Sequence, residues 1–482
     1  MSILIGLARI KVVAILLGPA GVGMVGLLQS LVGTGAATGG LGIPSSGVRQ
    51  IAEDAASGDE KALTGTRSAL FWGSVLLAAI VTFVFWLFGE PIAVHVLGDR
   101  RQAAMMGWIG LAAGLTILVN AQGALLNGFR RIGDIARVGV YGTLLGTVLG
   151  IAVLLIWREE ALVAYVVIAP LALVITGVMI ARRLPRPSRI ALTTKDRWRY
   201  WLPLFKLGIS FMGASIAGTL MLLIIRSIVG QRLGAAPLGE FSAAWTVSMT
   251  YTGFVLTAMA ADYYPRLTAA ISDPVVANRM VNEQSEIGLL LAAPVLIGVQ
   301  AAAPWVIRLL YSSQFDGAVD VLRWQIAGDV LKIIGWPLGF VTLAAGRGRV
   351  FLAVEVMEAA FFSAFIWLTI DALGLAATGV GFLLMYAIYV PTVYLLARRQ
   401  TGFRWTRPVA SAAAGLMTAV ALTGACGMAS DLLGFAVGSV LAAAMGVLAL
   451  LRLDTLGVFQ GKLARLGPLA TALRARVTVR AR

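Results

Sequence analysis

Arginines lie inside two long apolar stretches of this 482-residue chain, Arg9 eight residues before Leu17 and Arg226 seven before Leu233. A charge at the centre of a bilayer costs at least about 2.5 kcal/mol, so it normally faces a wet cavity or a partner. Because a guanidinium offers forked donors that match phosphate oxygens, two arginines at matched depth predict a diphosphate site. Lys11, about 200° around the helix from Arg9, is a further candidate. The alternative is that both arginines reach the interface or tie helices together.

A polar stripe crosses another apolar stretch. Gln325, Asp329, Lys332 and Trp336 fall at i, i+4, i+7 and i+11, which places them on one face of a helix. We expect this face to line a cavity, with Lys332 sharing the diphosphate. Alternatively, Asp329 and Lys332 neutralise each other at i, i+3.

Carboxyl groups within the apolar stretches are candidates for coupling to an ion. Glu355 and Glu358 are spaced i, i+3, and together with Asp329 they could bind a proton or a sodium ion. A solvated helix end explains the two glutamates equally well.

A third group of residues is predicted at the inner ends of helices, as a cytoplasmic mouth. Its members are Arg49, Arg266, Asp262, Tyr263 and Tyr264. The arginines could collect an anionic head group and the tyrosines could stack on a sugar. Charge bias across the membrane and interfacial anchoring are the simpler explanations.

The composition requires a lipid environment for the elements that carry these residues. Hydrophobic residues make up 59% of the chain and charged residues 13%, which is more apolar than a soluble fold can bury. The apolar runs are continuous rather than alternating, which predicts helices and not a β-barrel. The single Cys426 and single His95 give no basis for a Cys- or His-based metal site.

Apolar runs separated by polar breaks predict fourteen membrane-spanning helices. Their approximate ranges are 1–17, 22–43, 68–89, 103–126, 138–157, 161–181, 203–229, 238–261, 284–311, 322–345, 350–370, 374–397, 408–428 and 432–451. With this count, 28 of the 39 Lys and Arg residues fall in loops on one side of the membrane and six on the other, including Arg308 and Arg323. Since basic loops stay in the cytoplasm, both termini are predicted inside, and the net charge of +16 needs no nucleic acid.

The sequence repeats itself at a period near 217 residues. Leu17-Gly18-Pro19-Ala20-Gly21-Val22-Gly23 reappears as Leu233-Gly234-Ala235-Ala236-Pro237-Leu238-Gly239. Two halves of six helices each are therefore expected, related by an axis along the membrane normal. The predicted domains are a six-helix bundle at 1–181, a basic cytoplasmic linker at 182–202, a second six-helix bundle at 203–397, two additional transmembrane helices at 408–451 and a basic cytoplasmic tail at 452–482.

Five short motifs in order give the chain a family resemblance. They are the LGPAGVG turn, Ser45-Ser46-Gly47-Val48-Arg49-Gln50-Ile51-Ala52, Asp262-Tyr263-Tyr264-Pro265-Arg266-Leu267, Val281-Asn282-Glu283-Gln284, and Gly328-Asp329 with Trp336-Pro337. Together they resemble the polysaccharide-transporter branch of the multidrug/oligosaccharidyl-lipid/polysaccharide (MOP) flippase superfamily, and most of all its O-antigen and enterobacterial-common-antigen translocases.

This resemblance implies an all-α polytopic membrane protein of the cell inner membrane, with a V-shaped pair of six-helix bundles around a central cavity. It implies a flippase that moves an undecaprenyl-diphosphate-linked glycan to the outer leaflet by alternating access, with no cofactor. Partners would be the bilayer and polysaccharide polymerase or assembly proteins. In the lipid II flippases an arginine of a Gly-x-Ala-Arg stretch lines the cavity, and Gly6-Leu7-Ala8-Arg9 matches it. The two additional helices resemble the pair that holds the lipid tail in those flippases.

Two other functions are alternatives to this one. A multidrug antiporter of the same superfamily would need an acidic cavity, whereas five basic residues lie within the predicted spans. A membrane glycosyltransferase or polysaccharide polymerase would need catalytic residues in a long outer loop, and the predicted outer loops are short. A nucleotide-driven pump is not indicated, because the sequence has no Gly-rich loop ending in Gly-Lys-Ser/Thr.

Overall fold

The computed structural model describes residues 2–184 and 193–456, and over these ranges the chain is helical with no β-strand. The predicted all-α class is therefore confirmed. The main helices up to residue 232 are α1 (Ser2–Gly39), α2 (Ile43–Ser57), α3 (Glu60–Leu87), α4 (Gly89–Ile92), α5 (Ala103–Gly128), α6 (Ile132–Trp157), α7 (Leu162–Ala181) and α8 (Thr194–Arg232). Those that follow are α9 (Ala235–Ala270), α10 (Pro274–Ala301), α11 (Ala303–Leu310), α12 (Ala318–Ala344), α13 (Gly348–Leu373), α14 (Ala376–Thr401), α15 (Arg407–Ala429) and α16 (Asp431–Thr455).

Short irregular turns connect some of these helices. They are a π-helical turn η1 (Ala93–Leu97) and the 3-10 turns η2 (Arg100–Gln102), η3 (Arg158–Ala161) and η4 (Ser313–Phe315). Pro185 and Pro187 of the predicted linker, and the predicted basic tail beyond residue 456, lie outside the described residues.

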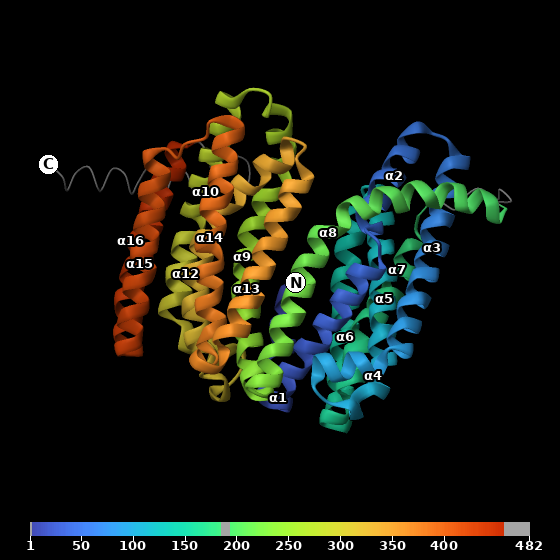
Figure 1. Ribbon diagram of the computed structural model, residues 1–482, viewed down its shortest axis with the longest axis horizontal. Helices are drawn as coiled ribbons and strands as arrows, with labels where there is room; N and C mark the ends of the chain where they lie inside the picture. Colours follow the sequence, from blue (N-terminus) through green and yellow to red (C-terminus); the bar gives the residue numbers. More distant parts are fainter. Residues whose placement is uncertain (1, 185–192, 457–482) are drawn as a thin grey trace. The chain divides into compact units, whose positions relative to one another are not determined.

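Packing divides the chain into two compact units. The first unit holds the described residues up to Ser242, together with Leu310–Gln314 and Ile366–Asp371. The second unit holds Ala243–Leu309, Phe315–Phe365 and the described residues from Ala372 onward. Within the first unit α3, α5, α6 and α7 run alongside one another, and within the second unit α10, α12, α14, α15 and α16 do so (Figure 1).

Helix α8 packs within the first unit, against α1, α2 and α3. The sequence assigned this helix to the second bundle from its place in the repeat. A helix can pack in one compact unit and still belong to the other half of the sequence repeat. The predicted domain boundaries therefore stay a prediction.

Eleven stretches of the described chain are long and apolar enough to cross a membrane. One of them, Ile132–Ala181, contains both α6 and α7. The first stretch lies in α1, whose backbone leaves the helical conformation at Gly18 with φ 62° and ψ −170°. This break lies between the first two predicted spans. The chain is a multi-pass helical membrane protein, and the count of fourteen spans stays a prediction.

Four details differ from the sequence prediction. Residues 43–57 form a helix, α2, where a cytoplasmic loop was expected, and α3 begins at Glu60 rather than near residue 68. The span predicted at 284–311 is instead α10 followed by the separate short helix α11. Arg323, which was assigned to an outer loop, is a buried residue of α12.

Local sequence explains where several helices begin and end. The Asp59 carboxylate accepts hydrogen bonds from the backbone N–H groups of Lys61 and Ala62, both at 2.9 Å, and so caps α3. Asp273 caps α10 in the same way, immediately before Pro274 at the first helical position. Gly58 ends α2 in the left-handed conformation, at φ 71°.

The repeated turn is visible in the backbone of the first unit. Gly18 and Gly234 occupy the same place in the two copies of the motif, and both have positive φ, 62° and 97°. The final glycines of the two copies, Gly23 and Gly239, lie against each other, because a Cβ built on Gly23 would be 2.6 Å from the Gly239 nitrogen. A Cβ on Gly239 would be 1.9 Å from the Pro19 carbonyl oxygen. The two turns therefore approach each other at a distance that only glycine permits.

Candidate functional site

Asp329 is the centre of a buried polar cluster in the second unit. Its side chain on α12 is fully buried. One carboxylate oxygen, Oδ2, accepts hydrogen bonds from Ser248 Oγ at 2.7 Å and from the Tyr251 hydroxyl at 2.6 Å, both on α9. The other oxygen, Oδ1, has no hydrogen-bond partner within the described residues. A buried carboxyl group with one oxygen that lacks a hydrogen bond is energetically costly in an apolar environment. Binding of a proton or a small cation would reduce that cost.

Lys332 lies one turn further along α12 and is half-buried. Its ammonium group is 3.4 Å from Met249 Sδ and 5.8 Å from the centre of the Tyr386 ring. Within the described chain no carboxylate oxygen lies within 4.0 Å of Lys332, so it and Asp329 do not form a direct ion pair. The two groups lie within electrostatic reach of each other, so their partial mutual neutralisation remains an alternative to a cavity-lining role.

The two glutamates of α13 belong to the same cluster. Glu358 lies beside the Tyr386 hydroxyl of α14, and Glu355 lies within electrostatic reach of Tyr386 and Tyr389. Both glutamates are half-buried rather than exposed. Gln325, one turn before Asp329, is fully buried, and neither polar atom of its amide has a partner among the described residues. Three helices therefore bring the predicted stripe and the predicted glutamates together.

The predicted cations of the first unit have different surroundings. Arg226 is buried, and its Nη1 donates to the Gly26 carbonyl and to Ser30 Oγ of α1, both at 2.6 Å. Lys11 donates to the backbone carbonyl of Tyr311. Arg226 thus joins α8 to α1, and Lys11 joins α1 to the segment that follows α11.

Arg9 differs from both of these residues. It is half-buried within a membrane-spanning stretch and lies within electrostatic reach of Tyr165 on α7. Over the described ranges it has no hydrogen bond or ion pair with another side chain. Its five N–H donors are therefore available to an anion.

Two tyrosines of the predicted inner mouth belong to one aromatic group in the second unit. Tyr263 is buried, donates its hydroxyl to the Pro337 carbonyl at 2.9 Å, and packs near Trp336 and Phe340 within the second unit. Tyr264 packs near Phe340 as well. Tyr263 therefore holds α9 to α12.

The charged residues of the predicted mouth lie on α2 and α9. Arg49 forms an exposed i, i+4 ion pair with Glu53 on α2, at 2.7 Å. Arg266 is exposed on α9, and the side chain of Asp262 lies outside the described residues. An exposed pair such as Arg49–Glu53 contributes little to stability.

Sequence reasoning missed the residues that complete these arrangements. Ser248 and Tyr251 share one face of α9 at i, i+3, and this spacing could have been recognised in the sequence.

Glu286 is nearly buried on α10 and accepts a hydrogen bond from Arg452 of α16 at 2.6 Å. Arg323 pairs with Asp431 at 3.0 Å. These two ion pairs join α16 to α12 and to α10 within the second unit.

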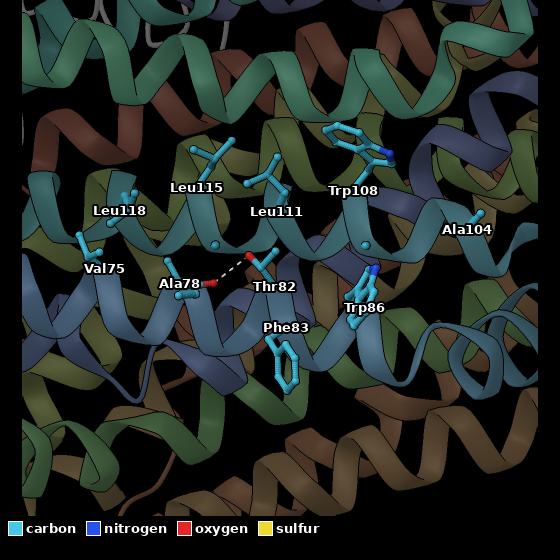
Figure 2. Close-up of a pocket in the computed structure, with 13 residues that line it drawn as sticks. Val75, Ala78, Thr82, Phe83, Trp86, Ala104, Trp108, Leu111, Leu115 and Leu118 are labelled. Carbon is cyan, nitrogen blue, oxygen red and sulfur yellow. Dashed lines mark hydrogen bonds between the residues drawn. The ribbon is translucent and has the colours of Figure 1, made fainter.

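The first unit also has an apolar groove of about 730 Å³ between α3 and α5. Figure 2 shows Trp86 and Trp108 towards one end of it and Val75 and Leu118 at the other. Thr82 uses its hydroxyl in a hydrogen bond to the Ala78 carbonyl at 2.8 Å. Such a lining suits a hydrocarbon chain and offers little to a charged or hydroxylated ligand.

In the described part of the chain, no group of three or more His, Cys, Asp or Glu side chains could hold a metal ion. The long apolar helices define a multi-pass helical membrane protein.

Sequence comparison defines the family. Residues 12–320 match the family described as polysaccharide biosynthesis protein, and the chain belongs to that family. A lipid III flippase from Escherichia coli (strain K12) is 23% identical over 405 residues, which cover 82% of this chain and 95% of that protein. The succinoglycan biosynthesis transport protein ExoT from Rhizobium meliloti (strain 1021) is 24% identical over 334 residues, covering 69% of this chain and 62% of that protein.

Solved structures show the same fold. The lipid II flippase MurJ in an inward closed conformation aligns with a TM-score of 0.70 at 11% identity, over 93% of this chain and 96% of that one. An inward-facing multidrug resistance MATE family transporter of the MOP superfamily aligns with a TM-score of 0.68 at 18% identity, over 83% and 95%. The family match confirms the predicted resemblance to proteins of polysaccharide biosynthesis, and the fold is the one found in these flippase and transporter structures.

Proposed function

We propose that this protein is a flippase that moves a polyprenyl-diphosphate-linked oligosaccharide from the cytoplasmic to the outer leaflet of the inner membrane by alternating access. The likeness to the lipid III flippase, which extends over 95% of that protein's length, carries the proposal. The chain would have both termini in the cytoplasm. The glycan would be an O-antigen or another surface-polysaccharide repeat unit, handed on to polymerase or assembly proteins.

In this proposal Arg9 and Lys332 bind the diphosphate. Both are half-buried in membrane-spanning helices, and neither has a carboxylate within ion-pairing distance in the described structure. A half-buried cation without a direct ion pair is costly in a membrane, and a phosphate oxygen reduces that cost while forming a strong hydrogen bond. Arg226 donates through Nη1 to Gly26 and Ser30, and Lys11 donates to the Tyr311 carbonyl, so we assign both residues to holding helices together.

Directionality in the proposal comes from an ion at the Asp329 cluster. Its unsatisfied carboxylate oxygen and the unsatisfied Gln325 amide offer oxygen ligands in a water-poor place. A proton or a sodium ion binding there would change the charge beside Lys332 and so its attraction for the diphosphate. Glu358 and Glu355 are the carboxyl groups that such a charge change would reach next.

Transport in proteoliposomes tests the proposal. The wild type and the variants Arg9→Gln, Arg9→Lys and Lys332→Gln would be reconstituted at equal amounts with a fluorescent polyprenyl-diphosphate oligosaccharide. We expect Arg9→Gln to lower the initial flipping rate about tenfold or more, because a charge-assisted hydrogen bond contributes about 1.5–3 kcal/mol. Arg9→Lys should retain part of the rate, because it keeps the charge and loses the forked geometry.

Arg101→Gln is the matched control, since Arg101 is an exposed arginine in the short turn η2, at the start of the apolar stretch Arg100–Gly128. Its rate should equal that of the wild type. If the wild type moves no such lipid but exchanges an organic cation for protons, the multidrug alternative replaces the proposal. That alternative draws its support from the buried Asp329 carboxyl, which suits a cationic substrate.

A further inference from the structure

A small pocket with both apolar and polar walls lies in the first unit at the C-terminal end of α8. Its volume is about 430 Å³, within the range of ligand-binding pockets. Its walls come from α8, from the π-helical turn η1, and from Trp367 in the part of α13 that packs with the first unit. The charge distribution predicts that this end of α8 is on the outer side of the membrane.

Hydrogen bonds fix the inner wall of the pocket. Ser227 Oγ donates to the Val96 carbonyl at 2.8 Å, and Gln231 Nε2 donates to the His95 carbonyl at 2.7 Å. A π-helical turn has carbonyl groups that a regular helix would satisfy, and α8 satisfies two of them here. The wall is therefore preformed before any ligand arrives.

The rim of the pocket carries an ion pair and an exposed aromatic ring. Arg232, the last residue of α8, pairs with Asp371 of α13, and both side chains remain partly exposed to solvent. Trp367, one turn before Asp371, is 56% exposed. Paired charges have little net charge, yet they still present N–H donors and carboxylate acceptors side by side.

These features suit a neutral hydroxylated ligand better than an anion. An anion would have to compete with Asp371 for Arg232, whereas sugar hydroxyl groups can accept from the arginine and donate to the aspartate at once. The apolar face of a sugar ring packs well on an exposed indole. Ile224 and Leu220 add an apolar floor. The apolar groove between α3 and α5 has exposed tryptophans as well, but it has no ion pair at its rim.

We propose that this pocket binds the saccharide part of the lipid-linked oligosaccharide on the outer side of the membrane. The proposal rests on the proposed function for the identity of the ligand. It adds a second, outer place of contact, separate from the Arg9 and Lys332 cations. There the glycan would be held after the diphosphate has left them.

Equilibrium binding of the free oligosaccharide tests the pocket without requiring transport. The oligosaccharide would be released from its diphosphate lipid, labelled at the reducing end, and titrated against full-length protein in nanodiscs. The variants are Trp367→Ala and Trp367→Phe, with Trp108→Ala as the control, because Trp108 is similarly exposed in the apolar groove. We expect saturable binding by the wild type, and about tenfold or greater weakening by Trp367→Ala.

Trp367→Phe should stay within about threefold of the wild type, because phenylalanine keeps an aromatic face at the site. Trp108→Ala should bind as the wild type does. No saturable binding by the wild type, or equal affinity of the wild type and Trp367→Ala, overturns the proposal. So does binding that anionic phospholipid vesicles abolish, which would make the pocket a phospholipid head-group site.

The two proposals fail separately. If the wild type flips the lipid-linked oligosaccharide but does not bind the free one, the outer pocket is wrong and the proposed function stands. If it binds the oligosaccharide at Trp367 but moves no lipid, the pocket stands and the transport proposal is wrong.

Discussion

The ion pair between Arg452 and Glu286 predicts an asymmetric response to removal of its two partners. Arg452 on α16 is 46% exposed at the side chain, whereas Glu286 on α10 is 9% exposed. Removal of the arginine leaves a carboxylate with little access to water. Removal of the glutamate charge leaves an arginine that water can still solvate.

The expected magnitudes follow from that difference in exposure. Breaking a fully buried ion pair costs about 3–5 kcal/mol, and side-chain hydrogen bonds in a membrane protein couple by up to about 1.7 kcal/mol. Because Arg452 is half exposed, we expect Arg452→Gln to cost about 1.5 kcal/mol, roughly tenfold in the unfolding equilibrium. Glu286→Gln should cost about 0.5 kcal/mol, since the amide still accepts a hydrogen bond.

A double-mutant cycle measures this coupling. Unfolding would be followed by tryptophan fluorescence as SDS is titrated into mixed micelles, for the wild type, both single variants and the double variant. The double variant should be about as stable as Glu286→Gln alone. The matched control is Arg279 with Glu283 on the same helix, 3.9 Å apart and both exposed, whose coupling should stay below about 0.5 kcal/mol. Equal costs for the two single variants, or additive costs in the double variant, would refute the reasoning.

Three further outcomes can be checked. Arg226→Ala removes two hydrogen bonds between α8 and α1, and it should lower the thermal unfolding temperature and the yield of folded protein, measured by size-exclusion chromatography. Gly239→Ala should also lower the unfolding temperature, because its Cβ would collide with the Pro19 carbonyl. Gly253→Ala in the same helix is the control and should leave that temperature unchanged, because no described atom lies within 4 Å of a Cβ at that position. Asp329→Asn should make the flipping rate in proteoliposomes independent of an imposed proton or sodium gradient, while an unchanged gradient response would place ion coupling elsewhere.

Hydropathy and the distribution of charge predicted the fold class because every membrane-spanning helix needs a long apolar stretch with few charges. Long apolar stretches have to be helices in a bilayer, whatever they pack against. The amphipathic helix α2 was missed because it is not an apolar span. Its sequence nevertheless carried the signals, with Pro44 in its first turn and Gly58 after its end.

Side-chain partners were much less predictable than spans. The stripe through Asp329 could be read from helical spacing, since all its members lie on one helix. The matched depths of Arg9 and Arg226 could also be read, but depth does not reveal what a guanidinium touches. Arg226 is bonded to a carbonyl group 200 residues earlier in the chain, and no local pattern contains that information.

The pairing of Glu286 with Arg452 has a consequence for how the protein is made. The two residues are 166 positions apart, so at about 5–20 residues per second the ribosome needs roughly 8–30 s to reach the arginine after it has made the glutamate. The acceptors of Arg226 are already present when it is synthesised, because Gly26 and Ser30 precede it in the chain. Until α16 emerges, the Glu286 carboxyl group has no arginine partner and needs contact with water. The second unit is therefore completed only at the end of synthesis, and a ribosome that stops before residue 452 leaves a nearly buried acid without its arginine.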